Sequence, residues 1–151
     1  MRDKYVFSNG QALSTLDSTG VVSSNVFDME LDASGGNTIL TDDQVEVFFN
    51  VQVLSSTNTA GDEGMDVELR MGDNSDMTTG GVVIASMHLA QADIAAGTIR
   101  SIKVLKSLAY KFLGAWFKAT NTSLDNATGV DCWLSDVPDG SPNDSIQKVP
   151  S

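Results

Sequence analysis

The residues with the widest chemical repertoire are scarce: the chain of 151 residues has one histidine, His88, and one cysteine, Cys132. His88 stands in the apolar run 82–89, whereas a metal centre needs several histidines and carboxylates that converge on one ion. Cys132 lies among apolar residues in 130–134, which is typical of a small buried hydrophobic side chain. We find no Gly-x-Ser-x-Gly motif, phosphate-binding loop or dinucleotide fingerprint. The sequence therefore predicts a protein without catalytic residues, metal or cofactor.

Carboxylates are abundant, and two groups of them could in principle do chemistry. Asp62, Glu63 and the segment 73–76 offer the oxygen ligands that Ca²⁺ prefers, but their spacing does not match an EF-hand loop. Asp28 and Glu30 stand two residues apart on one face of a predicted strand, where a glycosidase pair could sit. Nothing in the sequence predicts a cleft around them. We therefore interpret both groups as solvated carboxylates.

The overall charge excludes two classes of partner. Twenty acidic residues against nine basic ones give a formal net charge of −11, which argues against non-specific binding to nucleic acids and to anionic membranes. No apolar run approaches the roughly 20 residues that span a bilayer. Residues 1–7 have no apolar stretch behind them, so we expect no secretory signal. A single cysteine fits synthesis in a reducing compartment.

The basic residues are unevenly distributed along the chain. No acidic residue occurs between Asp93 and Asp125. That stretch carries five bases: Arg100, Lys103, Lys106, Lys111 and Lys118. They could protect strand edges against unwanted pairing, or they could form a basic patch that meets an acidic partner or a neighbouring copy. The sequence leaves both interpretations open.

Alternation of apolar and polar residues dominates the chain. Residues 45–53 and 65–71 alternate with period two, which predicts half-buried strands. The same reading predicts strands at 26–31, 82–89, 99–105, 110–120 and 130–134, and one or two short strands within 4–15. The strand 110–120 is apolar on both faces, so we expect it in the centre of a sheet. Phe48 and Leu54 fall on the outward side of their strand.

About eight strands with turn-rich connections predict an all-β, single-domain jelly roll or antiparallel β-sandwich. The domain is expected to cover residues 1–134 with its N-terminal segment. Residues 135–151 contain all three prolines of the chain and are expected to form an extended C-terminal tail. Residues 90–96 could form a short helix or, equally, the edge of a strand that leads into Gly97.

Two short motifs near the N-terminus carry a resemblance to a known family. Phe7-Ser8-Asn9-Gly10-Gln11-Ala12 and, further on, Ser23-Ser24-Asn25-Val26-Phe27-Asp28-Met29 are similar to the opening of the jelly-roll capsid cement (decoration) proteins of short-tailed bacteriophages. The strands at 45–53 and 65–71 fit the same outline, which covers roughly residues 4–134. The basic stretch 99–118 and the tail have no counterpart in it.

The resemblance implies a structural virion protein without catalytic activity. Such proteins bind the outer surface of a capsid built from HK97-like major capsid proteins, and they join neighbouring capsomers as homo-oligomers, so a dimer is expected here and a trimer is the alternative. On this hypothesis the protein is made in the host cytoplasm, is located on the outer capsid surface of the virion, and contacts neither nucleic acid nor membrane. The candidate contacts to the capsid or to a second subunit are Tyr5, Phe7, Phe48, Lys103, Lys106 and Lys111.

A second hypothesis is a carbohydrate-binding β-sandwich module at a virion or cell surface. Trp116, Trp133 and Tyr110 could stack on sugar rings if they were exposed. All three lie in apolar, strand-like contexts, so we expect them to be core residues instead. Burial of the two tryptophans separates the two hypotheses.

Overall fold

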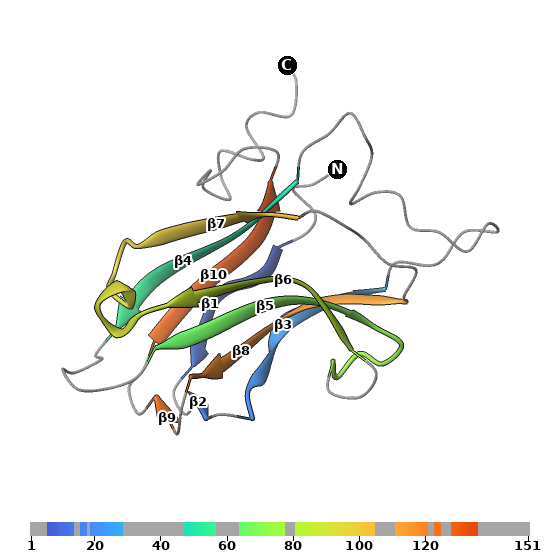
Figure 1. Cartoon of the computed structure of the whole chain (residues 1–151), viewed down its shortest axis with the longest axis horizontal. Helices are drawn as coiled ribbons and strands as arrows, with labels where there is room; N and C mark the ends of the chain where they lie inside the picture. Colours follow the sequence, from blue (N-terminus) through green and yellow to red (C-terminus); the bar gives the residue numbers. More distant parts are fainter. Residues whose placement is uncertain are drawn as a thin grey trace, which may run out of the picture.

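The computed structural model describes residues 6–13, 16–17, 19–28, 47–56, 64–77, 81–104, 111–120, 123–124 and 128–135. Within these ranges the chain forms ten strands and one short 3₁₀ helix, η2 (Figure 1). The elements, in chain order, are β1 (Val6–Leu13), β2 (Leu16–Asp17), β3 (Val21–Asp28), β4 (Phe48–Ser56), β5 (Met65–Gly72), β6 (Val82–Leu89), η2 (Gln91–Asp93), β7 (Ile99–Lys103), β8 (Phe112–Ala119), β9 (Ser123–Leu124) and β10 (Thr128–Ser135).

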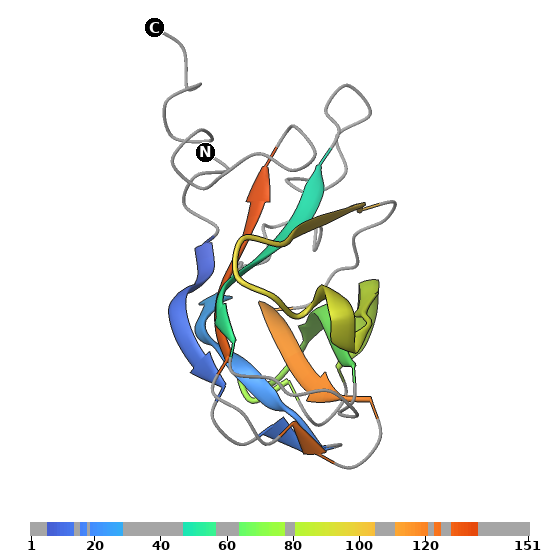
Figure 2. The ribbon, with the colours of Figure 1, turned by 90° about the vertical axis from the view of Figure 1, so that its left-hand side faces the viewer.

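The eight longer strands form two four-stranded antiparallel sheets that face each other (Figures 1 and 2). The first sheet has the order β1-β10-β4-β7 and the second β3-β8-β5-β6, while β2 pairs with β9. When only the eight longer strands are counted along the chain, these orders become 1-8-3-6 and 2-7-4-5. This is the connectivity of a jelly roll. The predicted all-β fold is therefore confirmed.

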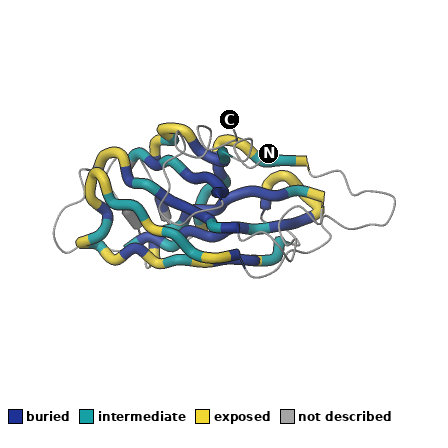
Figure 3. Tube along the Cα trace, turned by 90° about the horizontal axis from the view of Figure 1, so that it is seen from above, coloured by how far each residue is buried: buried dark blue, intermediate teal, exposed yellow. Residues whose placement is uncertain are grey.

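The core lies between the two sheets and follows the period-two pattern of the sequence. In β5 the side chains of Met65, Val67, Leu69 and Met71 are fully buried. Burying each such side chain contributes roughly 1.5–3 kcal/mol. Figure 3 shows the buried runs along the strands and the exposed residues at the turns. As predicted, β8 is a central strand, since it pairs with both β3 and β5.

Some elements differ from the sequence prediction. β1 is one continuous strand with a β-bulge at Gly10. Gly10 has a φ of 67°, a backbone conformation that favours glycine. β3 begins at Val21, five residues before the strand predicted at 26–31. The short helix expected at 90–96 is reduced to the three residues of η2. Residues 136–151, nearly all of the predicted tail, lie outside the described residues, and Ser135 belongs to β10.

Two connections cross between the sheets at the same end of the sandwich. β3 ends and β8 begins there, because Asp28 pairs with Phe112, and β4 begins and β7 ends there, because Phe48 pairs with Lys103. Phe7, at the start of β1, packs on Phe27 of the second sheet, so the two sheets meet at this end. We call it the crossover end.

Candidate functional site

All four described members of the predicted contact set lie at the crossover end. Phe48, the first residue of β4, is directly opposite Lys103, the last residue of β7. Lys111 immediately precedes β8, and Phe7 lies at the start of β1. Residues 48 and 103 are far apart in the sequence, so only the pairing of β4 with β7 brings them together. Tyr5 and Lys106 lie outside the described residues.

Phe7 supports this end from the inside. Its side chain is fully buried, with its ring centroid 5.4 Å from that of Phe27 and 6.1 Å from that of Phe49, both edge-on. Such aromatic pairs favour edge-to-face packing. Phe7 lies on the inward side of β1, so its side chain belongs to the core and not to the contact surface where the sequence analysis placed it.

The other three side chains reach the surface. Phe48 is half-buried, and Lys103 and Lys111 are exposed. The ammonium group of Lys111 lies 3.8 Å from a carboxylate oxygen of Asp28, with 55% and 45% of the two side chains exposed. It also lies 5.2 Å from the ring centroid of Phe112. Exposed ion pairs contribute little to stability, so Lys111 remains able to bind another anionic group.

The basic stretch of the sequence does not form one patch. Arg100 and Lys103 belong to β7 in the first sheet, whereas Lys118 belongs to β8 in the second. Arg100 pairs with Asp93 at 3.0 Å, and Lys118 pairs with Glu68 at 3.2 Å. Among the described residues of the stretch, Lys103 and Lys111 are the two that lie at the crossover end with Phe48.

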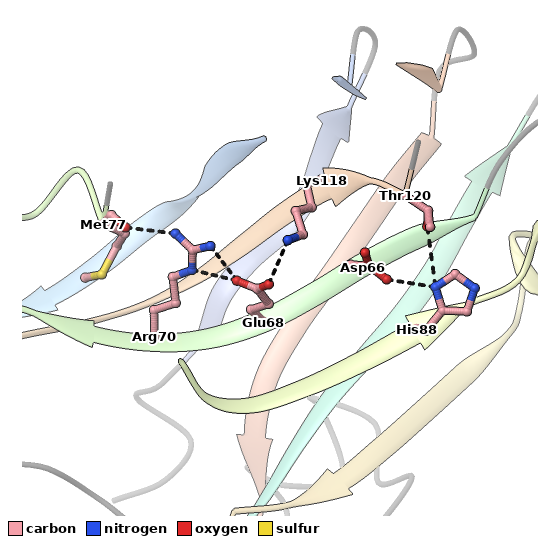
Figure 4. Close-up of polar contacts among 7 residues, drawn as sticks. All are labelled: Asp66, Glu68, Arg70, Met77, His88, Lys118 and Thr120. Carbon is pink, nitrogen blue, oxygen red and sulfur yellow. Dashed lines mark hydrogen bonds and ion pairs between the residues drawn. The ribbon is translucent and has the colours of Figure 1, made fainter. Parts of the chain in front are cut away.

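The outward face of the second sheet carries an ion cluster (Figure 4). Glu68 is 9% exposed, and its Oε2 accepts a hydrogen bond of 2.7 Å from Nε of Arg70. Its Oε1 faces Lys118. The Arg70 guanidinium lies 4.6 Å from the ring centroid of Trp116 and donates a hydrogen bond of 3.0 Å to the carbonyl of Met77.

The loop that follows β5 closes over this cluster. Met77 has a φ of 61°, rare for a bulky residue, and its side chain is fully buried. An added Cβ at Gly114 would lie 3.2 Å from its terminal methyl carbon, so Met77 rests on β8. Glu68 binds two cations, and Arg70 binds a carboxylate, a carbonyl and an aromatic ring. We therefore interpret the cluster as structural.

His88 takes part in a smaller polar group on the same face (Figure 4). Its Nδ1 lies 2.7 Å from Oδ1 of Asp66 and 3.4 Å from Oγ1 of Thr120. Both partners approach the same ring nitrogen, whereas a nucleophile activated by a histidine–carboxylate pair lies at the other one. Among the described residues, no three His, Cys, Asp or Glu side chains are grouped so that they could hold a metal ion.

Cys132 is fully buried on the inward side of β10, as the sequence analysis expected. Burial raises the pKa of its thiol well above the ordinary value, and the nearby charge of Asp131 raises it further. A thiol that resists ionisation is a poor nucleophile.

The two tryptophans are buried but not in the core between the sheets. Trp116 is 5% exposed and Trp133 is 1% exposed. Each alternates with core residues on its strand, so Trp116 lies on the outward face of the second sheet and Trp133 on that of the first. Neither indole N–H has a hydrogen-bond partner within the described part of the chain. Neither ring face is free to stack on a ligand, and Tyr110 lies outside the described residues.

Comparisons with known proteins identify no family. No family model matches the chain, and no curated protein matches it. Among solved structures, the chain is similar to the CBM22-1–GH10 modules of endo-1,4-β-D-xylanase 10B from Clostridium thermocellum, solved with xylohexaose, at 14% identity and a TM-score of 0.36. The match covers 91% of this chain and 29% of that one, so the chain spans less than a third of it. The only helix within the described ranges is η2, and none there has the length and hydrophobicity to cross a membrane.

Proposed function

We propose that this protein is a structural virion protein that binds the outer surface of an HK97-like capsid through its crossover end and cements neighbouring capsomers. The observation that carries the proposal is that three of the six predicted contact residues, Phe48, Lys103 and Lys111, reach the surface at that end. Phe48 and Lys103 are directly opposite each other there, Lys111 immediately precedes β8, and Phe7 packs in the core beneath them. The resemblance of the N-terminal motifs to capsid cement proteins supports the same function.

The chemistry of this surface fits an acidic partner. A half-buried phenyl ring beside an exposed lysine offers apolar area together with a positive charge. Complementary charge favours encounter and fixes the orientation of docking. A capsid repeats the same binding site many times. Weak contacts that are linked by the symmetry of the shell give high avidity without a tight single interface.

The carbohydrate-binding alternative loses its main support. It requires aromatic rings that are free to stack on sugars, and both tryptophans are buried. Arg70 lies over the Trp116 ring and occupies the face that a sugar would need. A jelly roll is compatible with either function, so these side chains, and not the fold, favour capsid binding over carbohydrate binding.

Binding to capsids tests the proposal directly. Purified protein is mixed with expanded capsids that lack it, and co-sedimentation and the temperature at which the shells open are measured. We expect the wild type to bind and to raise that temperature. Lys103→Glu combined with Lys111→Glu should weaken binding at least tenfold. Arg100→Glu makes the same charge change as either single lysine substitution, near the other end of β7, and should leave binding unchanged.

Two results would overturn the proposal. One is a wild-type protein that does not bind the shells at all. The other is an equal loss of binding in the Lys103/Lys111 double variant and in the Arg100 control, because net charge and not the crossover end would then control the interaction. Circular dichroism of each variant verifies that it is folded.

A further inference from the structure

Strand β6 has an edge with which a further strand could pair. It forms one edge of the second sheet and pairs only with β5 within the described residues. Its eight residues, Val82-Val83-Ile84-Ala85-Ser86-Met87-His88-Leu89, include no proline, lysine, arginine or carboxylate. An edge strand presents unpaired N–H and C=O groups along its length, and natural proteins protect such edges with charges, prolines or bulges.

The opposite edges of the two sheets are tied to each other. Register shifts alone do not distinguish them from β6, because β1 carries two, β3 carries one, and β6 carries one where Ile84 is the extra residue. Side chains tie these two edges together: Gln11 donates a hydrogen bond of 3.0 Å to the carbonyl of Val22, and Asn25 donates one of 2.9 Å to that of Val6. The side of the sandwich formed by β1 and β3 is therefore closed to a further strand.

The remaining edge, β7, is protected by charge and by its length. It has five residues, and two of them are the exposed cations Arg100 and Lys103. Two copies of β7 placed side by side would bring these like charges close together, which is unfavourable. β1 is as long as β6 and is also uncharged, but side chains link its edge to β3. Of the two edges on the other side of the sandwich, β6 is the longer and, apart from His88, the uncharged one.

We infer that β6 pairs antiparallel with β6 of a second copy of this chain, about a two-fold axis near Ser86, so that the two second sheets join into one. A two-fold interface places the same surface on both sides, and an uncharged strand meets no like charge when it pairs with itself. Ser86 is exposed, and Val83 is 39% exposed, one of two large hydrophobic side chains described as exposed. Pairing would cover Val83 in both copies.

This arrangement has a consequence for the ends of the dimer. β6 begins at the crossover end, because Val82 and Leu113 both pair with Met71. Antiparallel pairing therefore directs the two crossover ends away from each other. A dimer built in this way presents one contact surface at each of its two ends. The inference bears on the proposed function but does not depend on it, since it concerns only two copies of this chain.

Charge substitution at Ser86 tests the pairing. By light scattering after size-exclusion chromatography, we expect wild-type protein to be a dimer at micromolar concentrations. Ser86→Lys and Ser86→Glu each place two like charges near the axis and should raise the dissociation constant about fivefold or more. A one-to-one mixture of the two variants should restore the dimer, because the opposing charges then attract. The same pair of substitutions at Asn9, exposed on the β1 edge, should change nothing.

Cross-linking gives a second, independent readout. Residues opposite each other in an antiparallel pair have Cα atoms roughly 4.5–5.5 Å apart, within the range of a disulfide. Oxidised Ser86→Cys should therefore form a covalent dimer, and Asn9→Cys should not; the buried Cys132 does not interfere. Wild-type protein that stays monomeric up to millimolar concentration overturns the inference. So does a dimer that neither Ser86 charge variant weakens, whether or not the protein binds capsids.

Discussion

Replacement of Glu68 by glutamine tests whether the ion cluster on the second sheet holds the fold together. The two side chains have nearly the same shape, so the substitution removes charge without leaving a cavity. In the wild type one carboxylate oxygen faces Arg70 and the other faces Lys118. A glutamine offers one oxygen and one NH₂ group. Whichever way its amide turns, the NH₂ group faces a cation that it cannot bind.

The expected loss follows from burial. Breaking a buried ion pair by removing one partner costs about 3–5 kcal/mol. In the variant, Arg70 still donates a hydrogen bond to the carbonyl of Met77 and still lies over the ring of Trp116, and Lys118 is partly exposed to water. These interactions offset part of the cost of leaving the two cations without their carboxylate. We therefore expect Glu68→Gln to lower the free energy of unfolding by about 2 kcal/mol. In a domain of this size that corresponds to a decrease in Tm of about 4–8 °C.

Urea denaturation followed by tryptophan fluorescence measures this loss, because Trp116 lies against Arg70. Asp93→Asn is the matched control. It removes the carboxylate of the Arg100 pair, in which both side chains are largely exposed, and should change the free energy of unfolding by no more than about 0.5 kcal/mol. If the two variants lose the same small amount, the cluster is not a stabilising element and the reasoning from burial fails.

Three further predictions use other parts of the fold. Gly20→Ala should lower the free energy of unfolding by about 2–4 kcal/mol, because its Cβ would lie 2.7 Å from the Phe117 carbonyl. Gly97→Ala, which has a similar positive φ but open space around it, should cost only about 1 kcal/mol, and equal losses would contradict the argument. The raised pKa of Cys132 means that the native state holds the thiol proton more tightly than the unfolded state, so stability should fall as pH rises above about 8.5. Cys132→Ala should flatten that fall in urea titrations at several pH values. Iodide should quench the fluorescence of native protein weakly and that of unfolded protein strongly, since both tryptophans are buried; strong quenching of the native state would reopen the carbohydrate hypothesis.

The sequence predicted the strands best where one face meets the core. In β5 the apolar residues alternate without interruption, and every inward one is fully buried. Central β8 was recognisable because both of its faces are apolar, and burial in the middle of a sheet requires this. Period-two alternation is a direct consequence of strand geometry, so it can be recognised in a single segment without knowledge of the neighbouring strands.

The start of β3 was missed because its polar residues resemble a turn. Ser23 is buried, and its hydroxyl accepts a hydrogen bond of 3.0 Å from the backbone N–H of Ala115 on β8. The same hydroxyl donates one of 2.7 Å to the carbonyl of Asn25. A side chain thus replaces a backbone group in the ladder at the register shift between Val22 and Val26. This hydrogen bond between a side chain and the backbone depends on the partner strand β8, and the local sequence of β3 carries no information about that strand.

The candidate site was predictable in part. The outward position of Phe48 followed from alternation, but its place beside Lys103 depends on which strands pair. The placement of the tryptophans was harder to foresee. Alternation on β8 puts Trp116 on the outward face, and its burial there depends on Arg70. The burial of an outward-facing side chain depends on its neighbours on adjacent strands. The apolar residues around Trp116 in the sequence indicated only that its ring would be buried.

The partners of the lysines distinguish their roles more clearly than their positions in the sequence do. Lys118 meets a carboxylate that is 9% exposed, so water screens the pair weakly and its charge is committed to the fold. Lys111 meets Asp28 at the surface, where water and salt compete with the pair and the charge stays available to a partner. The described lysines of the basic stretch differ in this way because β7 and β8 belong to different sheets. The proposed contact surface lies at the crossover end because Lys103, at the end of β7, and Lys111, directly before β8, both lie there.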